Sequence, residues 1–63
     1  MIEYIPMDSW GGEHGIFTSL HDAQQAANRA YRNSSYLEEH FGIWEVDDHQ
    51  LIKIHKYRVP SVK

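Results

Sequence analysis

The stretch Ser19-Leu-His-Asp-Ala-Gln-Gln-Ala-Ala-Asn-Arg-Ala-Tyr-Arg32 contains the start, the period and the end of one amphipathic helix. Ser19 followed by Asp22 is a capping pattern, in which the serine hydroxyl accepts a hydrogen bond from an N–H group of the first turn. At about 100° per residue, the apolar side chains fall within an arc of about 140°; they are Leu20, Ala23, Ala26, Ala27, Ala30 and Tyr31. The turn-forming run Asn33-Ser34-Ser35 follows. We therefore predict a main helix over residues 19–32 with one small-residue face.

The segments around this helix are rich in residues that favour strands. We predict extended pieces over residues 1–5, closed by Pro6, and over 15–18, 41–46 and 51–59. The polar run 47–50 has the length of a hairpin turn. The glycine-containing loop 6–14 is either a hairpin loop or a simple excursion, and the sequence leaves both alternatives open.

These elements predict an α+β fold in two layers, with a three- to four-stranded antiparallel sheet and the helix packed on one face. The second capping pattern, Ser35 to Glu38, predicts a short helical turn at about 36–40. The last strand has apolar residues on both faces, so it is either central or a self-association edge. Because the helix face is mostly alanine, we expect the sheet to supply the core volume from Ile2 or Tyr4, Ile16, Trp44, Val46, Ile52 and Ile54.

The composition limits the classes of protein that the chain can belong to. With 63 residues and no cysteine, it is expected to form a single small domain, 1–63, without disulfides. The start at Met1 leads us to expect a complete small gene product. No apolar run approaches the roughly 20 residues that span a bilayer, and the N-terminus does not look like a signal peptide. We therefore expect a cytoplasmic protein without membrane contact.

The net charge of −3 is unevenly distributed along the chain. Residues 1–50 contain all nine acids against two arginines, a balance of −7, whereas residues 51–63 contain four bases and no acid, a balance of +4. One interpretation is a strand with a basic solvent face beside an acidic one. The other is a binding surface with a positive stripe.

No motif for catalysis or for metal binding stands out. The five histidines show no i, i+4 spacing, and there is no cysteine nucleophile and no Gly-x-Ser-x-Gly run. The glycines at 11, 12 and 15 are separated from the helix by Ile-Phe-Thr and are not followed by the lysine of a phosphate-binding loop. We therefore predict no enzyme activity, no cofactor and no metal site.

The leading hypothesis is a small non-enzymatic module that binds another protein. Interfaces favour tryptophan, tyrosine and arginine anchors, and the candidates here are Trp10, Arg29, Arg32, Tyr36 and Tyr57. Each also has a purely structural interpretation: the aromatic rings pack on the core and the arginines pair with nearby glutamates. A homodimer is a related expectation, because a short chain with a two-faced last strand can complete its core with a second copy.

A nucleic-acid-binding protein is the alternative hypothesis. Lys53, Lys56 and Arg58 alternate with His55 and Tyr57, a mixture that can stack bases and neutralise phosphates. The isoelectric point near 5.9 weakens this alternative, because a largely acidic chain attracts a polyanion poorly.

The string Gly15-Ile-Phe-Thr-Ser19-Leu-His-Asp-Ala23-Gln-Gln-Ala26-Ala27, followed by Phe41-Gly-Ile-Trp-Glu-Val46, resembles a type of small β-α-β protein common in phage and bacterial genomes. The resemblance covers roughly residues 2–52 and rests on helix-start and packing residues. It implies a β-α-β arrangement and a phage or mobile-element setting. The leading hypothesis of a protein-binding module accordingly includes a phage-encoded modulator or inhibitor of a host protein. The resemblance itself implies no particular activity.

Overall fold

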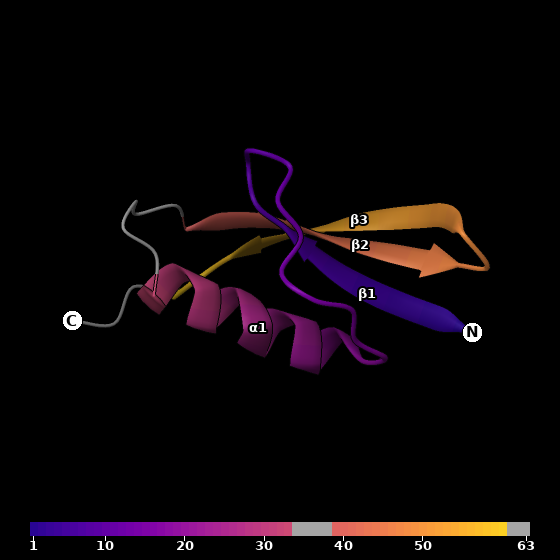
Figure 1. The fold of residues 1–63 in the computed structure, drawn as a ribbon, viewed down its shortest axis with the longest axis horizontal. Coiled ribbons are helices and arrows are strands. Elements are labelled where there is room, and N and C mark those ends of the chain that lie inside the picture. The colour runs from indigo at the N-terminus through magenta and orange to yellow at the C-terminus, as the bar shows by residue number, and fades with distance from the viewer. Residues whose placement is uncertain (34–38, 61–63) are drawn as a thin grey trace.

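The computed structural model describes residues 1–33 and 39–60 and contains, in that part of the chain, one helix laid on a three-stranded antiparallel sheet (Figure 1). The elements are β1 (Ile2–Met7), α1 (Leu20–Asn33), β2 (His40–Asp47) and β3 (Gln50–Arg58). The strand order is β1-β2-β3, so β2 is central. The predicted two-layer α+β arrangement is confirmed.

The start of α1 follows the predicted capping chemistry. The Asp22 N–H donates to Ser19 Oγ at 3.1 Å, and the Ala23 N–H donates to the Ser19 carbonyl at 3.2 Å. The helix then runs to Asn33, one residue beyond the predicted end. The second helical turn expected at 36–40 is not shown: residues 34–38 lie outside the described residues, and residue 40 already belongs to β2.

The β2–β3 hairpin is closed by the polar turn that the sequence predicted. Asp47 pairs with Gln50, and the two residues between them have positive φ, 53° for Asp48 and 68° for His49. Positive φ at both central positions is characteristic of a type I′ turn, whose twist matches that of the flanking strands. This hairpin places β3 at an edge of the sheet, so of the two interpretations of the last strand the central one is wrong.

The outer edge of β1 is covered by the chain that leads to the helix. Tyr4 and Phe17 exchange two backbone hydrogen bonds of 2.7 and 2.9 Å, and the His14 N–H donates to the Pro6 carbonyl at 2.9 Å. These antiparallel bridges support the hairpin alternative for the loop, although the predicted strand 15–18 is reduced to isolated bridges. Pro6 lies inside β1 instead of ending it, which is possible because a proline at an edge need not donate to a neighbouring strand.

The core lies between the alanine face of α1 and one face of the sheet. Ala23, Ala26 and Ala27 are at most 5% exposed, so the predicted docking of this face is confirmed. On the sheet side, the buried residues are Pro6, Phe41, Ile43 and Val59.

Most of the side chains expected to fill this core lie elsewhere. Side chains alternate between the faces of a strand, and because Phe41 and Ile43 face α1, Trp44 and Val46 point to the opposite face. Ile16, Ile52 and Ile54 are 58%, 54% and 47% exposed. The predicted core list was therefore largely wrong, because it selected large residues without fixing which face of β2 the helix covers.

The close approach of α1 predicts that a larger side chain at Ala27 is not accommodated. Ala27 is fully buried and clusters with Phe41 and Val59. We expect Ala27→Leu to lower the free energy of unfolding by about 1–3 kcal/mol through overpacking, measured by urea denaturation. Gln25→Leu, on the exposed surface of the same helix, is the matched control and should change stability little. Equal midpoints for the two variants would contradict the docked geometry.

Candidate functional site

Among the described residues, no helix or second sheet packs on the face of the sheet opposite α1, and we call it the open face. Its members are fixed by the strand register, because directly opposed residues share a face. The register gives three rows across β1, β2 and β3; they are Glu3-Val46-Leu51, Ile5-Trp44-Ile54 and Met7-Gly42-Lys56.

The open face is mainly apolar. Leu51 and Ile54 are 49% and 47% exposed, and the indole of Trp44 lies between Ile5 and Ile54 in the central row. Ile52, which has no partner in the β2 register next to the irregularity at Glu45/Val46, is 54% exposed. A sheet face turned to water normally carries polar side chains. Here, side chains suited to an interior lie on an uncovered surface.

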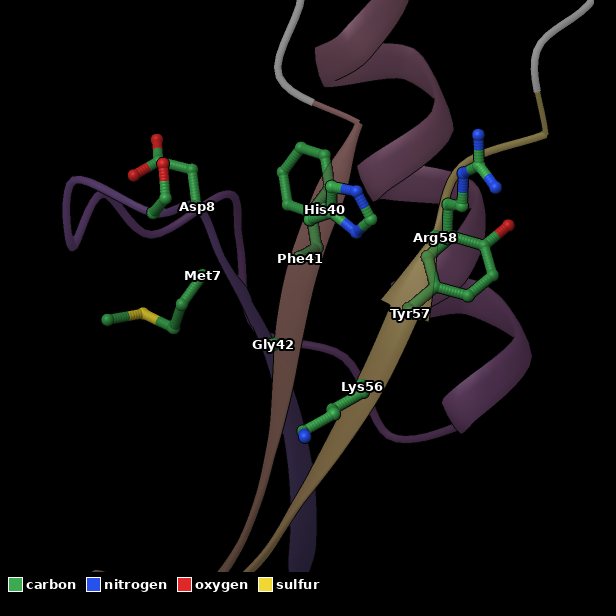
Figure 2. A pocket seen from close by; sticks show the side chains of 9 residues that line it. Met7, Asp8, His40, Phe41, Gly42, Lys56, Tyr57 and Arg58 are labelled. Carbon is green, nitrogen blue, oxygen red and sulfur yellow. The ribbon is translucent and has the colours of Figure 1, made fainter.

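A hollow of about 430 Å³ adjoins the open face where β1 leaves the sheet (Figure 2). Gly42 is one of its lining residues, and a Cβ at this position would lie only 3.1 Å from Ile54 Cγ2. Three separate parts of the chain line the hollow, and the lining residues are Met7, Asp8, Ser9, His40, Phe41, Gly42, Lys56, Tyr57 and Arg58. The lining combines apolar groups with basic ones and the Asp8 carboxylate, which suits a side chain or peptide of mixed character.

The loop that borders this hollow is held in shape by Asp8. Its Oδ1 accepts hydrogen bonds from the Trp10 N–H at 2.9 Å and the Gly12 N–H at 2.8 Å, and its Oδ2 lies 2.9 Å from His14 Nε2. Figure 1 shows the loop rising on the side of the sheet away from α1. Trp10 is 68% exposed in this loop. Asp8 thus fixes the backbone of the loop that carries the exposed Trp10.

Burial by itself raises the pKa of the Asp8 carboxyl. Hydrogen bonds from the Gly12 N–H, the His14 ring and the Trp10 N–H outweigh that effect, so the pKa lies below its ordinary value of 3.8. The charged form is therefore the one that the folded loop stabilises.

The structure does not gather the predicted partner-binding residues at one place. Trp10 lies in the loop, whereas Arg29 and Arg32 are exposed on α1. The Tyr57 hydroxyl donates to Asn28 Oδ1 at 2.8 Å and its ring packs against the buried cluster, which matches the structural interpretation. Tyr36 lies outside the described residues.

The cations proposed for nucleic-acid binding are divided between the two faces of β3. Lys53 pairs in register with Glu45 and shares the helix side, whereas Lys56 pairs with Gly42 on the open face. Arg58 is held by Glu39, with its Nε and Nη2 atoms each 3.0 Å from Glu39 Oε1. No single basic surface is formed from these three side chains.

Other polar groups of the sheet are engaged with one another. His55 Nε2 lies 2.7 Å from Glu45 Oε1, and the His55 ring centroid is 6.1 Å from that of Tyr4. Within residues 1–33 and 39–60, no three His, Asp or Glu side chains are placed to hold a metal ion. In the same part of the chain, no helix has the length and apolar character needed to cross a bilayer.

The open-face residues were missed as functional candidates by sequence reasoning, although a signal for them was present. The run Phe41-Gly-Ile-Trp-Glu-Val46 places apolar side chains on both faces of a strand, and the helix has only one apolar arc. One helix covers one face, so an apolar face had to remain open within these elements.

Comparisons with models of protein families, with curated proteins and with solved structures give no match. The resemblance to small phage and bacterial β-α-β proteins therefore stays a prediction.

Replacing the Asp8 charge should weaken the loop in a pH-dependent way. A carboxyl whose pKa is lowered on folding stabilises the fold above its ordinary pKa of 3.8, and this contribution is lost as the pH falls through the folded-state value. We expect Asp8→Asn to lower the free energy of unfolding by about 1–2 kcal/mol near neutral pH, with the difference from the wild type shrinking below pH 3.8.

Urea titrations across the acid range measure this difference. Asp48→Asn is the matched control, because Asp48 is exposed in the hairpin turn and asparagine tolerates its positive φ. An Asp8→Asn effect that stays constant down to the lowest pH would show that the carboxylate charge does not stabilise the loop.

Proposed function

We propose that this chain is a small protein-binding module whose binding surface is the open face of the sheet. The observation that carries the proposal is the row Ile5-Trp44-Ile54, an apolar strip at the centre of the sheet in which Ile54 is exposed and Ile5 and Trp44 are partly buried. Contiguous exposed apolar surface on a small domain commonly marks an interaction site. Trp44 supplies the kind of aromatic anchor that interfaces favour.

The surroundings of this strip have the composition of an interface. The exposed Leu51 extends the strip towards the hairpin, and the hollow beside Gly42 makes the surface concave there. Charged groups such as Glu3 and Lys56 lie at its margin, as in a polar rim. We propose binding rather than catalysis because the surface offers apolar contact area in place of a group of acid–base side chains.

The finer expectations from the sequence stay predictions. These are the phage setting, the role as a modulator or inhibitor of a host protein, the cytoplasmic location and the homodimer. Light scattering at high micromolar concentration checks the homodimer, for which a mass of twice 7.4 kDa is expected. A monomer mass would remove it.

The nucleic-acid alternative has less support, because Lys53 and Lys56 project from opposite faces and Arg58 is paired with Glu39. It also stays a prediction. It requires binding to single-stranded DNA or RNA that weakens steeply with salt.

Disrupting the apolar strip should weaken partner binding strongly without unfolding the protein. We expect Ile54→Lys to reduce retention of a specific partner from a bacterial lysate at least about tenfold, because a charge replaces an apolar contact at the centre of the surface. The side chain is 47% exposed, so the substitution should be tolerated by the fold. Mass spectrometry of the captured proteins, quantified against wild type, measures the effect.

The matched control is Gln25→Lys, which adds the same charge on the exposed surface of α1. It should retain the partner at the wild-type level, and thermal melts should show that both variants fold. A partner that is kept equally by Ile54→Lys and Gln25→Lys would place the interface elsewhere, and the open face would no longer be the binding surface.

A further inference from the structure

The two outer edges of the sheet differ in their backbone pairing. On the outer side of β1, the segment that leads to α1 supplies backbone hydrogen bonds at Tyr4 and Pro6. On the outer side of β3, no strand pairs with Gln50–Arg58 among the described residues. An edge of this kind presents backbone N–H and C=O groups that can pair with another extended chain.

The side chains of β3 give this edge a single sign of charge. The strand carries Lys53, Lys56 and Arg58 and no acid. Lys53 and Lys56 are exposed and make no ion pair with the described residues. Because Lys53 lies on the helix side and Lys56 on the open face, the edge is positive on both sides.

From this arrangement, and resting on the proposed function, we infer that the free edge of β3 binds an extended acidic segment of the partner protein as a fourth strand. In strand addition, main-chain hydrogen bonds supply affinity and the alternating side chains supply specificity. Successive side chains of an added strand point to opposite faces. Carboxylates on either face of that strand would therefore meet Lys53 or Lys56.

A second copy of β3 fits this edge poorly. It would bring three more cations and no acid to the same boundary, and like charges across a strand pair are destabilising. An acidic strand has the complementary charge instead. Its apolar side chains would continue the open face next to Ile54 and Leu51, which are 47% and 49% exposed.

The test uses a synthetic peptide, acetyl-Val-Glu-Val-Glu-Val-Glu-Val-amide, titrated into isotopically labelled protein at low ionic strength. We expect NMR amide shifts concentrated in residues 50–58, and at least about tenfold slower hydrogen exchange for β3 amides that point away from β2. The same peptide with lysine in place of glutamate should not bind. Exchange protection distinguishes backbone pairing from a purely ionic contact between side chains.

The double variant Lys53→Gln/Lys56→Gln should weaken peptide binding at least about tenfold. The matched control, Arg29→Gln/Arg32→Gln, removes two positive charges from the exposed surface of α1 and should change binding less than about twofold.

The inference is overturned by any of three results: no shifts up to about 1 mM peptide, equal binding of the lysine peptide, or shifts without exchange protection of β3. An oligouridine that perturbs residues 50–58 while the acidic peptide does not would assign the edge to nucleic acid instead. Such failures leave the capture experiment on Ile54→Lys unaffected, so the strand addition and the proposed function can fail separately.

Discussion

A single helix has to stabilise a sheet that is apolar on both faces, and this constraint shapes the whole molecule. The alanine face of α1 allows a close approach, so Phe41, Ile43 and Val59 are buried against it. The same sheet has Trp44 and Ile54 on its other face. Since the described elements include no second helix or sheet, the interior that they build is one-sided, and apolar side chains remain on the opposite face.

The two edges of the sheet differ in whether the protein's own chain covers them. The chain folds back along β1 through Tyr4, Pro6 and Phe17, so that side is occupied by the protein itself. The other side ends in β3, where lysines stand on both faces. Lysines at an edge discourage pairing with an identical strand. The same positive charge makes the edge complementary to an acidic strand, the occupant that we propose for it.

The sequence predicted the positions of the helix and strands more accurately than which face of each strand is buried. Ser19 marked the start of α1, and the run Asp47–Gln50 marked the hairpin turn. The choice between the two faces of β2 was not available from periodicity, because both faces contain apolar residues. Trp44 was therefore assigned to the core when it belongs to the exposed side. Of the residues selected as contacts, Tyr57 packs against the buried cluster and donates a hydrogen bond to Asn28, while it also lines the hollow.

Local chemistry determined the helix, its cap, the extended segments and the two-layer class, because capping, periodicity and turn preferences act over a few neighbouring residues. The amino-acid sequence by itself also determined the basic character of β3, since no acid occurs after residue 48. Only the tertiary structure decided which sheet face is covered and which edge is free. Those choices depend on pairing between segments some 40 residues apart, such as Ile5 with Trp44, and on the side from which α1 docks.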